Sequence, residues 1–125
     1  MAMSNAKKQK LEESLRKSGA ITPTDKFIDA GYANHIQLLQ RPQPGFACFT
    51  EEKFIWTGGL SSDIVIPYDQ IQELGKCLVM LMPMGIKISY QPTPGGKIVK
   101  KKFSIWKRNT WLALMAEKSG VPSPV

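Results

Sequence analysis

Histidine and cysteine are the scarcest chemically reactive residues of this sequence. One histidine, His35, and two cysteines, Cys48 and Cys77, stand among its 125 residues. The cysteines match no Cys-x-x-Cys or zinc-finger spacing, and we expect both to be free and buried as small apolar residues. A lone histidine without such a cluster does not make a metal site or a catalytic pair. We therefore predict no metal, no cofactor, no catalytic residues and no enzymatic activity.

Long apolar runs are also missing. No segment approaches the roughly 20 apolar residues that a membrane-spanning helix needs, and the N-terminus lacks the apolar core of a secretory signal. These absences, together with unpaired cysteines, favour a cytoplasmic or membrane-peripheral location. Apolar residues still make up 42% of the chain, which is enough for one domain with a packed core.

Acidic residues are few, and the positive charge is unevenly placed. The chain has 17 Lys and Arg against 10 Asp and Glu, a formal charge of +7. Residues 1–26 carry six cations against three acids, and residues 97–118 carry seven against one, whereas residues 27–96 carry four against six. An excess of this kind suits an anionic membrane, an acidic protein or a nucleic acid as partner.

Hydrophobic periodicity divides the chain into helical ends and a strand-rich middle. Helices are expected at residues 6–19 and 22–31, because each run ends at a glycine suited to the left-handed cap position. After Ile105 the apolar period lengthens to about 3.6 residues, which predicts a third, amphipathic helix that ends at Gly120. Between them, turn signals separate seven short strands. The expected strands are residues 35–39, 46–50, 54–60, 63–68, 79–82, 86–91 and 97–105.

This order of elements predicts a mainly β (α+β) fold. Seven antiparallel strands form a sandwich or a partly open barrel, which the C-terminal helix caps and a short helical extension precedes. The expected divisions are residues 1–34 for the extension, 35–119 for the domain and 120–125 for a tail.

Four segments carry a resemblance to a known family. They are "GFACFTEEKFIW", "IVIPYDQIQEL", "PMGIKISY" and "FSIWKRNTWLALM", and their order and spacing resemble the pleckstrin-homology-like superfamily in its GRAM and bacterial types. The resemblance covers about residues 35–119 and places Trp111 at the tryptophan of the family's C-terminal helix. It implies a non-enzymatic module that binds phosphoinositides, acidic membranes or peptides. The family's best-known lipid site uses several cations around the first strand–strand loop, where this chain has only Arg41.

The basic run near residue 100 is the candidate anion-binding surface. Strand alternation places Phe103 and Ile105 toward the core and Lys100 and Lys102 toward solvent. The candidate residues for phosphate or lipid headgroups are Lys97, Lys100, Lys101, Lys102, Lys107 and Arg108. An alternative interpretation is an edge strand that lysines protect from pairing with other chains. Binding of nucleic acid is disfavoured, since few aromatic residues alternate with these lysines.

Met80, Met82, Met84 and Trp106 are the candidate partner interface. On a continuous strand the three methionines share one face, and exposed methionines form adaptable binding surfaces. The alternatives are burial of the methionines beneath the N-terminal helices and ordinary packing of Trp106. Trp56 and Trp111 have apolar neighbours in their expected elements and are predicted to belong to the core.

Two hypotheses about function follow from these features. The leading one is a non-enzymatic interaction module that binds a protein or peptide partner or self-associates as a homo-oligomer. The alternative is peripheral binding of an anionic membrane or phospholipid headgroup through the basic C-terminal strand–helix surface.

Overall fold

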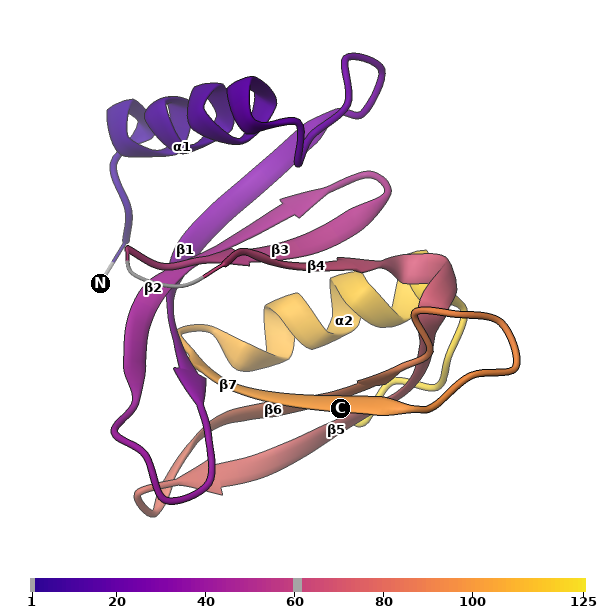
Figure 1. Cartoon of the computed structure of the whole chain (residues 1–125). Helices are drawn as coiled ribbons and strands as arrows, with labels where there is room; N and C mark the ends of the chain where they lie inside the picture. The colour runs from indigo at the N-terminus through magenta and orange to yellow at the C-terminus, as the bar shows by residue number, and fades with distance from the viewer. Residues whose placement is uncertain (1, 60–61) are drawn as a thin grey trace.

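The computed structural model describes residues 2–59 and 62–125 (Figure 1). One seven-stranded antiparallel sheet has the order β4-β3-β2-β1-β7-β6-β5, so that β4 and β5 form its edges within the described chain. In chain order the elements are α1 (Asn5–Ser18), β1 (Phe27–Ile36), β2 (Gln43–Thr50), β3 (Lys53–Thr57), β4 (Ile64–Pro67), the 3-10 helix η1 (Tyr68–Gln70), β5 (Ile71–Val79), β6 (Met82–Tyr90), β7 (Val99–Ile105) and α2 (Arg108–Ser119). The expected strand at residues 54–60 and the turn after it reach residues 60 and 61, which lie outside the described residues.

The sheet bends so that its two halves face each other. In Figure 1 the half made by β1–β4 lies above α2 and the half made by β5–β7 lies below it. The core fills this space with inward side chains of both halves and with the apolar face of α2. Trp111 of α2 stacks on Phe49 with ring centroids 4.3 Å apart, and the Nε1 of Trp56 donates a hydrogen bond of 2.9 Å to the carbonyl of Ala33. Both tryptophans are core residues, as predicted.

Helix α1 covers the outer face of β1–β3. Its left-handed cap is Gly19, with φ of 88°, a conformation that glycine adopts without steric penalty. Leu11 and Leu15 are its buried residues. They belong to a second apolar cluster with Met3, Ile21, Ala30, Cys48 and Ile55. The thin apolar stripe of α1 is thus sufficient to dock it on the sheet.

The helix expected at residues 22–31 does not form. The chain turns after Thr22, whose carbonyl accepts a hydrogen bond from the backbone nitrogen of Asp25, and β1 begins at Phe27. The Thr-Pro-Thr-Asp pattern that resembled a helix start makes only this turn. Pairing of β1 with β2 along almost its whole length overrides the local helix signal. Residues 27–34, which were expected in the extension, therefore belong to the sheet.

The position of one hairpin turn also differs from the expectation. The pattern predicted a strand through Met82 and a turn at residues 83–85, but β5 ends at Val79 and β6 begins at Met82. Only Met80 and Leu81 connect them, since Val79 and Met82 are paired. The pairing register of β5 and β6 determines the position of the turn. Ile71 lies opposite Tyr90 at the far end of the hairpin, and pairing from there leads to the turn at Met80 and Leu81.

None of the helices in the described ranges has the length and hydropathy needed to cross a bilayer.

Candidate interaction surface

One half of the molecule is built from an acid-free stretch of sequence. Residues 74–116 contain no Asp or Glu, but they contain eight Lys and Arg residues. This stretch forms most of β5, all of β6 and β7, and the first part of α2. The absence of acids from residues 74–116 is visible in the sequence. It was overlooked because the charges of residues 27–96 and 97–118 were counted separately. The basic character therefore belongs to a whole half of the sheet rather than to a C-terminal segment.

Three lysines gather on the outer face of β6 and β7. Lys87 on β6 lies directly opposite Lys102 on β7, and Lys100 lies opposite Ser89. Directly paired residues of antiparallel strands project to the same face, with Cβ atoms about 5 Å apart. Two lysines in such a pair repel each other, so the arrangement is favourable when an anion lies between them. We call Lys87, Lys100 and Lys102 the lysine face.

A shallow hollow adjoins the lysine face. Lys87 is also paired with Gly75 of β5, and a Cβ at that glycine would lie 3.3 Å from the Cε of Lys87. The lysine stem therefore lies over the glycine. The hollow measures about 310 Å³ and is lined by Glu73, Leu74, Gly75, Lys87, Ser89 and Lys100. Two ammonium groups and a hydroxyl can donate hydrogen bonds to phosphate oxygens here.

The structure separates the predicted lysine candidates. Lys100 and Lys102 point away from the core, as predicted, but Lys101 is paired with Ile88 on the inner face. Lys97 lies exposed in the loop between β6 and β7. Lys87 was missed, because only the strand register brings it opposite Lys102.

The two cations at the start of α2 lie apart from the lysine face. Lys107 is exposed with a φ of 59°. Arg108 is partly buried, and its Nη1 donates a hydrogen bond of 3.3 Å to the carbonyl of Cys77 on β5. The six candidates therefore do not form one patch.

The alternative interpretation of β7 as an edge strand is wrong from Lys102 onward, whereas Val99 to Lys101 pair with β6 alone. In the sheet order β7 lies between β1 and β6. It pairs with β6 from Val99 to Ser104 and with β1 from Lys102 to Ile105. The residue pairs are nonlocal in sequence, so the pattern of one strand did not reveal its neighbours. Lysines inside a sheet have no edge to protect, which removes this explanation for Lys102.

The predicted methionine interface is divided by the β5–β6 turn. Met80 lies in the turn itself, and its side chain is 83% exposed. Its neighbour in the turn, Leu81, is 87% exposed. Met82 and Met84 share a face of β6, and Met82 is exposed while Met84 is partly buried. The alternative of burial beneath the N-terminal helices is wrong, because α1 packs on β1–β3.

Trp106 borders a second hollow. Its side chain is 51% exposed, and its carbonyl accepts a 3.0 Å hydrogen bond from the Nε1 of Trp111. The hollow measures about 270 Å³ and is lined by Tyr32, Ala33, Asn34, Met84, Ser104 and Trp106. Met84 and Trp106, both predicted interface residues, thus meet at one place on the surface.

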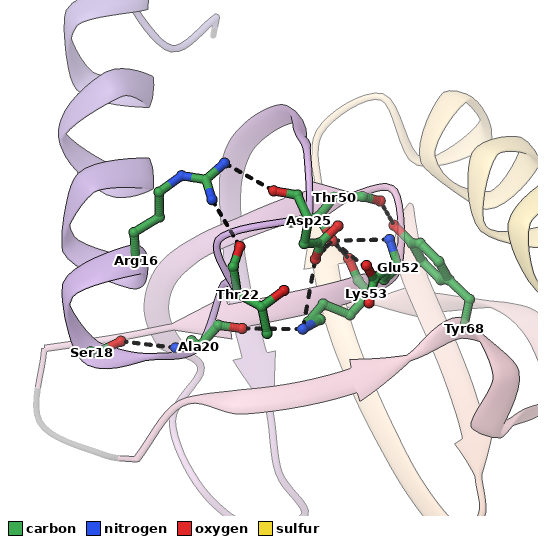
Figure 2. A network of polar contacts seen from close by, with 9 residues as sticks. All are labelled: Arg16, Ser18, Ala20, Thr22, Asp25, Thr50, Glu52, Lys53 and Tyr68. Carbon is green, nitrogen blue, oxygen red and sulfur yellow. Dashed lines mark hydrogen bonds and ion pairs between the residues drawn. The ribbon is translucent and has the colours of Figure 1, made fainter.

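A buried polar network lies between the loop after α1 and the turn that joins β2 to β3 (Figure 2). The hydroxyl of Thr50 donates a 2.6 Å hydrogen bond to Asp25, and the Nζ of Lys53 lies 3.6 Å from the same carboxylate oxygen. Arg16 of α1 donates to the carbonyl of Asp25, and Tyr68 donates to that of Thr50. These bonds join the loop after α1 to the turn between β2 and β3. The network therefore has a structural role.

The described residues contain no group of three His, Cys, Asp or Glu side chains placed to hold a metal ion. Burial lowers the pKa of His35, the charge of Lys101 lowers it further, and a side-chain hydrogen bond with Gln43 acts in the opposite direction.

No protein-family model and no curated protein matches this sequence. Solved structures do match. The C-terminal domain of an unknown protein from Leishmania infantum has a TM-score of 0.69 at 14% identity, covering 87% of this chain and 97% of that one. The Slm1 PH domain in complex with inositol 4-phosphate has a TM-score of 0.54 at 8% identity, covering 78% and 98%.

The N-terminal PH domain of Vps36 has a TM-score of 0.53 at 12% identity, covering 81% of each chain. Identities this low show the fold and nothing finer. The seven-stranded sheet with its C-terminal helix is a pleckstrin-homology-like (PH-like) fold.

Proposed function

We propose that this chain is a non-enzymatic PH-like interaction module that binds the surface of anionic membranes through its lysine face. The observation that carries the proposal is the pairing of Lys87 with Lys102 beside Lys100, on an outer sheet face that none of the described helices covers (Figure 1). Each cation near an anionic leaflet contributes about 1 kcal/mol of attraction. The Slm1 domain, which shares the fold, was solved with a phosphorylated inositol.

A role in solubility alone explains the lysine face less well. Solubility requires net charge, which scattered lysines supply without mutual repulsion. Here two ammonium groups are held on directly opposed residues, and Glu73 is the one acid that lines the adjoining hollow with Lys87 and Lys100. An anionic partner would supply the remaining counter-charge.

The GRAM or bacterial type of the fold stays a prediction.

The first prediction concerns charge removal. Lys87→Ala/Lys100→Ala/Lys102→Ala should weaken partition to vesicles of phosphatidylcholine and phosphatidylserine on the order of 100-fold at low ionic strength, from about 1 kcal/mol per lysine. Co-sedimentation at low and moderate salt measures this, and binding should fall as salt screens the charges.

The control is Lys10→Ala/Lys17→Ala/Lys26→Ala, which removes the same charge from exposed positions on and after α1. It should bind nearly as well as the parent protein. Equal loss in both variants would mean that net charge alone drives binding, and failure of the parent to prefer anionic vesicles would refute the proposed function.

A second candidate function is binding of a peptide segment in the hollow beside Trp106. The half-exposed indole ring and the partly buried Met84 there are typical of adaptable peptide-binding surfaces. Peptides selected from a displayed library on the parent protein should lose at least about tenfold in affinity for Trp106→Ala, as for a binding hot spot. Selected peptides that bind the variant equally well would exclude this hollow.

A further inference from the structure

The turn between β5 and β6 has an unusual composition. Met80 and Leu81 both have positive φ, at 50° and 66°, as in the two-residue turns of type I′. Such turns favour Asn-Gly, because most side chains clash with the backbone at positive φ. The turn therefore keeps two large apolar side chains at positions where local conformation disfavours both of them.

These two side chains and their apolar neighbours are exposed to solvent. Leu78, Met80, Leu81 and Met82 are all exposed, and together they form what we call the hairpin tip. Apolar surface of this kind is unfavourable in water and marks a contact with an apolar partner. Local strain and exposure thus point in the same direction, since a polar turn would relieve both.

Two cations lie behind the hairpin tip. Lys76 is exposed on β5, four residues before Met80. Arg108 bonds to the carbonyl of Cys77, which fixes its guanidinium against the base of the hairpin. An apolar end followed by cations matches the depth profile of a bilayer, whose hydrocarbon interior lies below anionic headgroups.

The hairpin tip and the lysine face belong to the same half of the sheet. In Figure 1 the β5–β6 turn lies at the bottom of the view, below β6 and β7 and on the side away from α2. A membrane that contacts the outer face of this half would therefore meet the turn as well.

We propose that the hairpin tip inserts into the apolar region of an anionic bilayer, while Lys76 and Arg108 contact the headgroups. This inference rests on the proposed function and adds an apolar contribution to it. The occupant is a lipid surface because the tip requires hydrocarbon and the cations behind it require a dense anionic layer, and a bilayer provides the two in this order.

The variant that tests the insertion is Met80→Asn/Leu81→Gly. It replaces the tip with the residues that the turn favours, so the thermal unfolding temperature should stay the same or rise. Partition to phosphatidylserine-containing vesicles should fall on the order of 10- to 100-fold, because two apolar side chains no longer leave water. The rise in surface pressure beneath a lipid monolayer of the same composition should disappear.

The comparison variant is Leu38→Asn/Leu39→Gly, which removes two exposed leucines from the β1–β2 loop, one of them at a positive φ of 61°. It should keep the parent's surface-pressure response. Loss of the response in this variant, with retention in Met80→Asn/Leu81→Gly, would overturn the proposal and assign insertion to the β1–β2 loop.

Two further outcomes separate this inference from the proposed function. If the parent binds anionic vesicles and Met80→Asn/Leu81→Gly binds them equally, the lysine face suffices and insertion is wrong. If the parent forms oligomers that only this variant dissolves, while vesicle binding is unchanged, the tip is an interface between copies and insertion is again wrong. If the parent binds no vesicles at all, both proposals fall.

Discussion

His35 lies on the inner face of β1 between two aromatic rings. Its ring centroid is 5.3 Å from those of both Trp56 and Phe103. A charged imidazolium is poorly solvated in such a place, and Lys101 adds a repelling charge. The sequence could not predict the charges around His35, because only the fold brings Lys101 near it.

The lowered pKa of His35 makes the stability depend on pH. The unfolded chain takes up a proton below about pH 6.5, whereas the folded chain resists this until a lower pH. The unfolded state therefore binds more protons in this window, and the free energy of unfolding should fall as the pH decreases from about 7 to about 5. Urea denaturation across this range measures the fall.

Two variants isolate the contribution of His35. In His35→Leu the free energy of unfolding should change less between these pH values, and in Lys101→Met the pKa of His35 should rise toward its ordinary value. As the only histidine of the chain, His35 gives an unambiguous NMR titration. A folded-state pKa at or above 6.5 would contradict this account.

At the scale of single elements, α1 seals one face of the sheet. Cys48 of β2 lies fully buried beneath it, in the cluster that contains Leu15. Burial, with a smaller effect from the charge of Asp63, raises the pKa of the Cys48 thiol to about 12. The thiolate is the reactive form, so a docked α1 keeps this cysteine inert.

Cys77, on the hairpin strand β5, is only partly buried, which corrects the expectation that both cysteines are buried. We predict that iodoacetamide labels Cys77 readily and Cys48 only when α1 detaches. Leu15→Ala should cost about 2–5 kcal/mol of stability and accelerate labelling of Cys48, as followed by mass spectrometry. Equal labelling rates for the two cysteines in the native parent would show that α1 does not protect this face.

At the scale of the whole molecule, the two outer faces of the sheet differ. One is covered by α1, and the polar network around Asp25 fastens the loop that follows this helix. The other, formed by β5–β7, has no described helix over it and carries the lysine face (Figure 1). The uncovered face carries the lysine face, and the hairpin tip of the same half carries exposed apolar residues.

The first strand–strand loop differs in composition from the lysine face. That loop contains Arg41 but also two exposed leucines, Leu38 and Leu39. The three cations of the lysine face lie on the outer face of the other half. Both sets of variants test the proposed contact of the β5–β7 half with a membrane. The charge variants of the lysine face test its electrostatic attraction, and the turn variants of the hairpin tip test its apolar contact.

The sequence by itself determined the elements whose signals are local. The glycine caps and apolar periods predicted α1 and α2, and alternation predicted strands at Phe46, Ile86 and Phe103. It also determined the basic charge of residues 74–116 and the free state of the cysteines, since these depend on composition and spacing.

Tertiary structure decided whatever depends on which strands are neighbours. It made residues 27–31 part of a strand against a helix-like pattern, because β2 pairs with β1 along this stretch. It placed β7 inside the sheet and Lys87 opposite Lys102. It moved the turn to Met80 and Leu81, where local preference opposes it. In each case many nonlocal backbone hydrogen bonds and a shared core outweigh a local preference of about 1 kcal/mol.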